Sequence, residues 1–185
     1  YSNKNLSDLI LKLEEINGLE RLRFTTSHPK DMNENLIKLF KVSKKLMPHL
    51  HLPVQSGSNV VLKNMNRKHT VEEYLKIIYQ LKEINPKIEF SSDFIIAYPG
   101  ETEEDFNLTL KLLNDIKYIN TYSYIFSPRY GTPAAKLNLI DEKIAKKRLT
   151  EFQNISEKIK KEYKRRSLNK TLKVLFENKI NNRQF

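Results

Sequence analysis

The 185-residue sequence contains no cysteine, and this absence excludes several kinds of site within it. Disulfides, thiolate ligation of zinc or of an iron–sulfur cluster, and cysteine nucleophiles all need a residue that the chain lacks. Glycine is scarce, with four residues, and neither G-x-G-x-x-G nor a Walker-type phosphate loop occurs. No apolar run approaches the roughly 20 residues that a membrane-spanning helix needs, and no signal peptide is visible. We therefore expect a cytoplasmic protein with no membrane partner.

The length fits one domain, with room for the start of a second. Apolar residues make up 39% of the chain, enough for a core, and charged residues make up 30%. The first residue is Tyr1, so we expect the sequence to be a piece of a longer protein.

Positive charge is concentrated near the end of the chain. The formal net charge is +11, and twelve Lys and Arg but only three Glu fall between Lys143 and Lys173. The rest of the chain therefore carries a net charge of only +2. Such a local cluster favours contact with a polyanion, and a solvated helix face is the alternative.

Hydrophobic periodicity predicts an α/β chain in which helices and strands alternate. Helices are predicted over residues 6–16, 32–47, 70–84, 103–116 and 141–167, and strands over 19–29, 49–54, 87–98 and 120–133. A further strand is predicted over 171–179. Strands that alternate with helices in this way indicate right-handed βα units and a parallel sheet, either open or closed toward a barrel.

Two helix starts carry capping signals. Thr70 and Glu73 have the spacing of a capping box. The acidic stretch after Thr102 invites a reading as a catalytic or Mg²⁺ site, but a capped helix with acid in its first turn explains it more simply. The sequence leaves the role of Glu101, on the preceding turn, open.

In a parallel sheet the catalytic and ligand-binding residues lie at the carboxyl ends of the strands. These positions are Ser27-His28, Gln55-Ser56, Tyr98 to Glu101, and Ser127 to Arg129. The residues alone point to no particular reaction.

Three further polar residues lie within predicted strands. His49 and His51 share one strand face, where hydrogen-bonded structural histidines are a simpler reading than a metal pair. Asp93 lies in a strand that is expected to be buried, where a charge is costly. It should either pair with a cation, such as Arg129, or point into a ligand cavity.

Four motifs, in this order, closely resemble those of the radical S-adenosylmethionine (SAM) methylthiotransferases, and most of all the MiaB-type tRNA enzymes. They are "RFTTSHP", "HLPVQSGS", "SSDFIIAYPGETEEDF" and "YSYIFSPRYGTPAA", and the resemblance covers residues 1–165. "MNRKHTVEEY" and "YSYIFSPRYGTPAA" favour the tRNA-modifying members over those that modify a ribosomal protein. Relatives that act on threonylcarbamoyladenosine are the nearest alternative.

The resemblance implies a partial (β/α) barrel of about four βα units over residues 1–167, and the first strand of a small RNA-binding β-barrel (TRAM) over 168–185. It implies part of a monomeric enzyme that adds a methylthio group to isopentenyladenosine beside the anticodon of tRNA. The whole enzyme would use SAM, two [4Fe–4S] clusters and an electron donor for cluster reduction. The cluster cysteines of the family have no counterpart here, so this chain should ligate no metal, contain no catalytic residue and be inactive alone.

The resemblance also assigns residues to surfaces. Those expected to line the cavity for SAM and substrate are Gln55, Ser56, Asp93 and Arg129, and the 98–101 loop should border the adenine of SAM. Those expected to contact RNA are Lys160, Lys161, Lys164, Arg165 and Arg166. Ala97 stands where the family commonly has glycine, so its methyl group should crowd the adenine.

Two other functions remain as alternatives. One is an RNA-binding relic that has lost the chemistry. The other is an aldolase-like βα enzyme, which would need a lysine or a carboxylate pair at a strand end, and none is evident.

Overall fold

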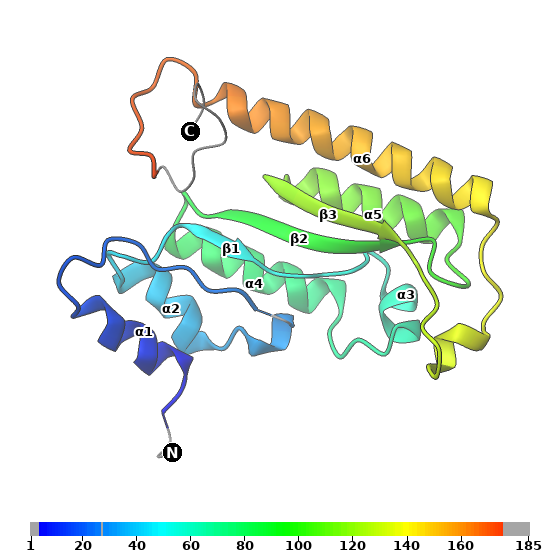
Figure 1. Cartoon of the computed structure of the whole chain (residues 1–185), viewed down its shortest axis with the longest axis horizontal. Helices are drawn as coiled ribbons and strands as arrows, with labels where there is room; N and C mark the ends of the chain where they lie inside the picture. The colour runs from blue at the N-terminus through cyan, green and yellow to red at the C-terminus, as the bar shows by residue number, and fades with distance from the viewer. Residues whose placement is uncertain (1–3, 27, 176–185) are drawn as a thin grey trace, which may run out of the picture.

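A computed structural model describes residues 4–26 and 28–175, which form one α/β unit (Figure 1). In chain order, the helices and strands are α1 (Leu6–Glu14), the 3₁₀ helix η1 (Pro29–Asp31), α2 (Glu34–Val42), β1 (His49–His51), α3 (Asn59–Asn64), α4 (Val71–Ile84), β2 (Glu89–Ile96), α5 (Glu103–Ile116), β3 (Asn120–Ile125), the 3₁₀ helix η2 (Pro133–Lys136) and α6 (Glu142–Arg165). Among these residues, no helix is long and apolar enough to cross a membrane.

The three strands of the described residues form a parallel sheet in the order β1-β2-β3. In Figure 1 the strands run from left to right, so α3 and η2 lie at their carboxyl ends and the end of α6 lies at their amino ends. The predicted parallel α/β architecture is therefore confirmed.

The core lies between the sheet and its helices. Phe94 of β2 packs against Tyr118 and against Phe152 of α6, with ring centroids 5.5 and 4.7 Å apart. The buried hydroxyl of Tyr118 donates to that of Tyr74, which donates to the carbonyl of Leu52, both at 3.0 Å. Because these buried polar groups are paired, the core contains tyrosines without a desolvation penalty.

The capped helices agree with the predictions. Thr70 with Glu73 and Thr102 with Asp105 both form complete capping boxes. The helix predicted over 103–116 has those bounds in the structure.

Two other segments differ from the predicted helices and strands. Within the predicted strand 19–29, the described residues form no strand and make only isolated parallel bridges, Leu22 to Leu46 and Thr25 to His51. α2 ends at Val42, before the predicted 47, because the following turn is held by Glu14, which accepts from the backbone N–H of Lys45 at 3.0 Å.

The predicted strand at 171–179 is not seen where the structure describes it. Residues 171–175 have no strand assignment, and the remainder, like Ser27, lies outside the described residues. The short helix α3, by contrast, was not predicted. Ser58 caps it, since its hydroxyl accepts from the N–H of Val61 at 3.3 Å.

Candidate functional site

The sheet face opposite the helices presents polar and aromatic side chains. Thr121 and Ser123 of β3 bond to side chains of α6, so the alternate residues Tyr122 and Tyr124 point to the other face. These tyrosines are 47% and 62% exposed. Tyr122 is in register with Asp93 of β2, which places the carboxylate on the same open face.

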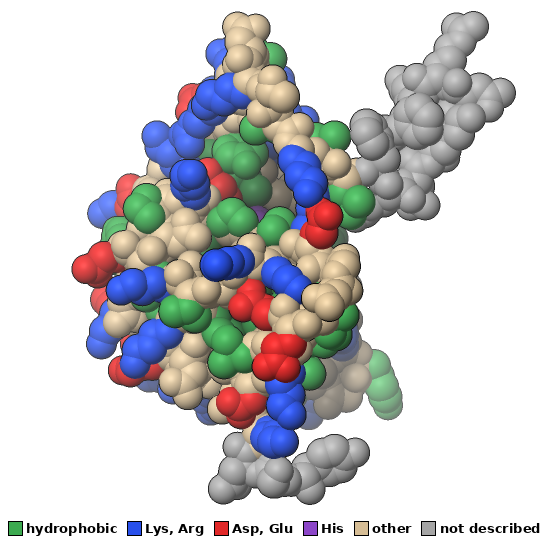
Figure 2. All heavy atoms as spheres, turned by 90° about the vertical axis from the view of Figure 1, so that its left-hand side faces the viewer, with side chains coloured by type: hydrophobic (Ala, Val, Ile, Leu, Met, Phe, Trp, Pro, Cys, Tyr) green, Lys and Arg blue, Asp and Glu red, His purple; other side chains and the backbone are tan. Residues whose placement is uncertain are grey.

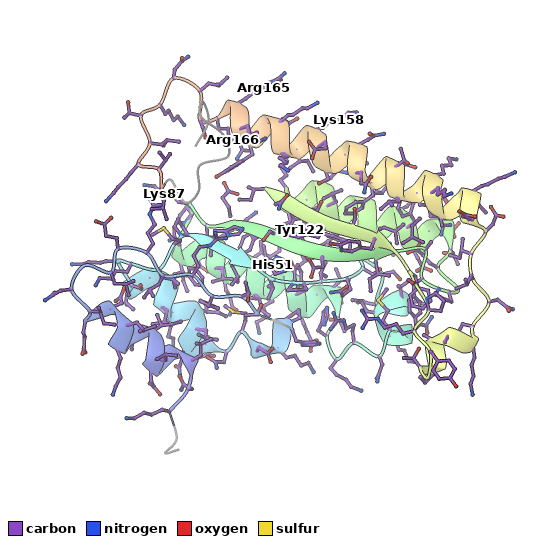
Figure 3. The ribbon with its side chains drawn as sticks, viewed as in Figure 1. His51, Lys87, Tyr122, Lys158, Arg165 and Arg166 are labelled. Carbon is purple, nitrogen blue, oxygen red and sulfur yellow. The ribbon has the colours of Figure 1, made fainter. Side chains whose placement is uncertain are left out.

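His51 joins the residues on this face (Figure 3). Its Nδ1 lies 3.0 Å from the hydroxyl of Ser91, its Nε2 lies 3.5 Å from Asp93 Oδ1, and its ring packs edge-on against Tyr122 at 5.9 Å. His49, on the same strand, bonds to Arg23. The reading of both histidines as hydrogen-bonded residues is confirmed, and the described residues contain no cluster that could hold a metal ion.

The expected pairing of Asp93 with Arg129 is wrong, since the basic side chain that the structure brings within 4 Å of the Asp93 carboxylate is that of His51. Asp93 is in register with Tyr122, whereas Arg129 lies seven residues further on, past the end of β3. The two charges therefore lie at different positions along the strand direction.

A cavity of about 460 Å³ lies at the carboxyl ends of β2 and β3. Its lining includes Ile95, Tyr98, Tyr124 and Arg129 together with Arg67, which follows α3. It combines apolar and aromatic walls with two guanidinium groups, which suits a ligand with a flat ring and an anionic group.

Arg67 is a candidate that the sequence reasoning missed. It is half-buried, and among the described residues it forms no ion pair within 4 Å. Burial lowers the pKa of Arg67, and Asp93 opposes that shift. A partly desolvated guanidinium without a partner is a natural site for an anionic ligand. Its loop has no periodicity, and its only signals were its basic character and its place in the stretch "MNRKHTVEEY".

The turn at Gln55 to Ser58 connects β1 with α3. Gln55 has a left-handed φ of 75° and is fixed by backbone bonds on both sides, to the carbonyl of Asp93 and from the N–H of Ile95, both at 3.0 Å. A strained backbone that is held so firmly is common at ligand sites. The backbone of Gln55 thus lies beside that of Asp93, toward the carboxyl end of β2.

Ser56 has a different environment. It is fully buried, and its hydroxyl lies 3.3 Å from that of Thr109 in α5 and accepts from the N–H of Ser58 at 3.1 Å. These contacts place its side chain against α5, in a structural position.

Glu101 is the last residue of the 98–101 loop, and its side chain is buried. Its carboxylate accepts from the N–H of Ala97 at 3.1 Å and from Arg148 of α6 at 2.8 Å. Burial raises the pKa of Glu101 to about 7, even though Arg148 lowers it. Arg148 also reaches Glu103 at 3.0 Å, so one arginine fixes the loop and the first turn of α5 to α6.

Ala97 gives the first prediction. Its φ is 58°, in the left-handed region that glycine adopts without strain. We expect Ala97→Gly to raise the free energy of unfolding by about 1 kcal/mol, because it relieves this strain. Urea denaturation measures the change, with Ala135→Gly in η2 as the control that should lose stability. A loss of stability in Ala97→Gly would contradict the interpretation.

Two histidines pack together where η1 and α4 begin. His28 Nδ1 accepts from the N–H of Lys30 at 3.1 Å, and its Nε2 lies 3.3 Å from Nδ1 of His69. His69 is 4% exposed. Burial, His28 and Arg67 lower the pKa of His69 to about 4.

This shift predicts acid sensitivity. Between pH 6.5 and 4 the unfolded chain protonates His69 while the folded chain does not, so stability is full above pH 6.5 and falls as the pH drops. The loss should reach about 3 kcal/mol near pH 4. Denaturation measured at several pH values should show a smaller pH slope for His69→Gln. The same slope in both proteins would rule out this source of acid sensitivity.

The basic helix residues lie at the far end of the sheet. Lys161, Lys164, Arg165 and Arg166 are exposed, whereas Lys160 is one-third exposed and lies 3.7 Å from Glu157. Figure 3 shows Arg165 and Arg166 at the amino ends of the strands, away from the carboxyl-end cavity.

Comparison with known proteins gives a consistent result. Residues 2–113 match the family model described as the radical SAM superfamily. The chain is 58% identical over 178 residues to a tRNA-2-methylthio-N(6)-dimethylallyladenosine synthase of Pelagibacter ubique (strain HTCC1062), and the match covers 95% of this chain and 39% of that protein. It is 49% identical to the protein of that name from Wolbachia pipientis subsp. Culex pipiens (strain wPip), covering 95% and 40%. The chain thus spans about two fifths of the length of these relatives.

A solved structure supports the fold. Coproporphyrinogen III oxidase from Escherichia coli, a radical SAM enzyme, is similar with a TM-score of 0.58 and 18% identity, over 75% of this chain and 32% of that chain. At this identity the similarity concerns the fold alone, and it agrees with a partial β/α barrel.

Proposed function

The chain belongs to the radical SAM superfamily, and we propose that it forms the carboxyl-terminal part of the SAM-binding barrel of a tRNA methylthiotransferase. The proposed substrate is isopentenyladenosine next to the anticodon. The observation that carries the proposal is the open sheet face, which ends in a cavity with two guanidinium groups. The chain that forms it is 58% identical to a tRNA-2-methylthio-N(6)-dimethylallyladenosine synthase. We further propose residues 1–167 as barrel, residues 168–185 as the start of a TRAM domain, and a monomer in the cytoplasm.

The cavity residues fit SAM. Arg67 would hold its carboxylate, and the ring of Tyr98 and the side chain of Ile95 supply apolar walls for an adenine. Arg129 also lines the cavity. Gln55 and Asp93 are not among its lining residues, but the backbone of Gln55 bonds to that of Asp93 and to that of Ile95, which does line the cavity. When bound, SAM supplies the radical that removes hydrogen from the target base. The residues of this chain bind and orient it.

Ser56 does not fit a direct contact. Its hydroxyl is engaged with Thr109 and Ser58, so we propose that it positions the turn that carries Gln55.

An iron–sulfur cluster does not fit the residues of this chain. The sequence has no cysteine, and the described residues contain no metal-binding cluster. We propose that two [4Fe–4S] clusters, reduced by an electron donor, are bound by other parts of the full-length protein.

The exposed end of α6 fits RNA. Lys161, Lys164, Arg165 and Arg166 present charge to solvent, and Lys160 contributes less because it faces Glu157. Replacing all five with Ala should weaken tRNA binding and flatten its salt dependence. Unchanged affinity would identify the cluster as a solvated helix face.

The test is the reaction itself. The full-length protein, reconstituted anaerobically with iron and sulfide, should cleave SAM and convert isopentenyladenosine in tRNA to its methylthio form, detected by mass spectrometry. Failure to cleave SAM would refute the proposed function. Cleavage without modification of this base would refute only the substrate.

A further inference from the structure

A second hollow opens at the amino ends of the strands, at the opposite end of the sheet from the carboxyl-end cavity. This amino-end groove has a volume of about 770 Å³ and is lined by Arg21, Arg23, Lys87, Tyr122 and Tyr163, among others. Figure 2, which faces this end of the molecule, shows a hollow with Lys and Arg side chains around it.

The basic residues of the groove are not neutralised by acids. Among the described residues, Arg21, Arg23 and Lys87 form no ion pair within 4 Å. Arg21 donates to the carbonyl of Lys173 at 3.3 Å, and Arg23 bonds to the ring of His49. Both partners are neutral, so the groove keeps a positive potential.

Two carboxylates belong to this region: Glu89, which lines the groove, and Glu20, which precedes Arg21 in the sequence. Glu20 pairs with Lys173 at 2.6 Å. Glu89 lines the groove; burial raises its pKa, and Arg166 and Lys82 lower it. Tyr163 of α6 lines the groove, so the end of α6 borders it, and Figure 3 shows Lys87 and Arg166 at this same end of the sheet.

We propose that the amino-end groove binds the phosphodiester backbone of the substrate RNA, in a contact separate from the base at the carboxyl-end cavity. The inference rests on the proposed function and extends it to residues outside α6. Unpaired Arg and Lys side chains suit phosphates, and the exposed Tyr122 on the wall suits a ribose or an unstacked base.

The length of α6 sets the spacing of the two contacts. Arg148 bonds to Glu101 at the carboxyl end, whereas Arg166, directly after α6, lies at the amino end (Figure 3). Eighteen residues at 1.5 Å each separate them by about 27 Å. Each strand of duplex DNA carries one phosphate per about 3.4 Å of helix axis, and on that spacing a base-paired stem would cover this distance in about eight steps. A free nucleoside cannot make both contacts, but a hairpin stem can.

The experiment measures RNA binding to the full-length protein over a range of salt concentrations. Two hairpins carry the same loop, one with a full stem and one with a stem too short to span eight steps. The variant combines Arg21→Gln, Arg23→Gln and Lys87→Gln. The matched control combines Lys41→Gln, Lys76→Gln and Lys111→Gln, which removes the same charge from the outer helices α2, α4 and α5.

We expect the groove variant to bind the long hairpin roughly tenfold more weakly, with the slope of log K against log salt reduced by about 2 to 3. It should bind the short hairpin like the parent protein, and the control should bind both hairpins like the parent. Unchanged affinity for the long hairpin overturns the proposal, as does an equal loss for both hairpins. Retained RNA binding with slower reduction by an acidic electron-donor protein also overturns it, since the groove would then dock that donor.

The design separates a loss of RNA binding from misfolding of the variant, and failure of this proposal from failure of the proposed function. If the triple variant has a lower melting temperature, the single variant Lys87→Glu replaces it, because Lys87 is exposed. Loss of long-hairpin affinity would support the groove even if the base is never modified. Modification of RNA with no effect of the groove variant would leave the function intact and refute the groove.

Discussion

Arg148→Ala should lower the free energy of unfolding by about 3 to 5 kcal/mol, because it leaves a buried carboxylate without its cation. The side chain of Glu101 is 1% exposed, and Arg148 binds both its carboxylate and its carbonyl, at 2.8 and 3.2 Å. The guanidinium also lies 5.5 Å from the ring centroid of Phe106. Urea denaturation measures the loss.

The pH dependence of this loss identifies its cause. The pKa of Glu101, about 7 with Arg148 present, should rise further without it. A carboxyl group whose folded pKa is raised is favourable below its unfolded pKa and loses that contribution as the pH rises through the folded value. The variant should therefore be closer to the parent at pH 5 than at pH 8.

Lys146→Ala is the matched control, because Lys146 lies on the same helix and pairs with Glu142 at 2.6 Å in an exposed position. It should cost less than about 1 kcal/mol. Equal losses for the two variants, or a loss in Arg148→Ala that does not depend on pH, would contradict the role of the buried pair.

Gly57→Ala should cost about 3 kcal/mol or more, because it forces backbone apart. A Cβ at this position would lie 2.5 Å from the carbonyl oxygen of Leu108 and 2.6 Å from Cα of Thr109. Both atoms belong to the backbone of α5 and cannot rotate away. The N–H of Gly57 also donates to the hydroxyl of Thr109 at 2.9 Å, and that bond would lengthen.

The control for this variant is Gly131→Ala. Gly131 has a φ of 82°, and nothing in the described part of the chain lies within 4 Å of the added Cβ. Its cost should be about 1 kcal/mol, from backbone strain alone. If Gly57→Ala were as mild in thermal or urea denaturation, the close approach to α5 would not be a constraint on the turn.

Local signals in the sequence predicted much of the fold. The capping residues Thr70 and Thr102 predicted where α4 and α5 begin, because a cap and its helix are a few residues apart. The parallel sheet followed from the alternation of helices and strands. The segment 19–29 has strand-like alternation but pairs only through isolated bridges, and pairing depends on distant residues that periodicity does not report.

The site was predictable only in part. Gln55 and Asp93 were expected at the cavity; the structure bonds their backbones together, but neither is among the residues that line the cavity. Arg67 follows α3 in a loop whose course depends on tertiary packing, so no spacing placed it near Asp93. Arg148 was counted among the basic residues of the last helix, but it is 7% exposed and paired with Glu101, 47 residues away.

The central claim, that the carboxyl-end cavity holds SAM, is tested most directly by equilibrium binding of SAM to the full-length, cluster-loaded protein and to Arg67→Ala. Removal of a charge-assisted hydrogen bond of about 1.5 to 3 kcal/mol predicts affinity lower by roughly tenfold to a hundredfold. Lys68→Ala, next to it and exposed, should bind SAM like the parent. Unchanged SAM affinity in a folded, cluster-loaded Arg67→Ala variant would contradict the assignment of this cavity.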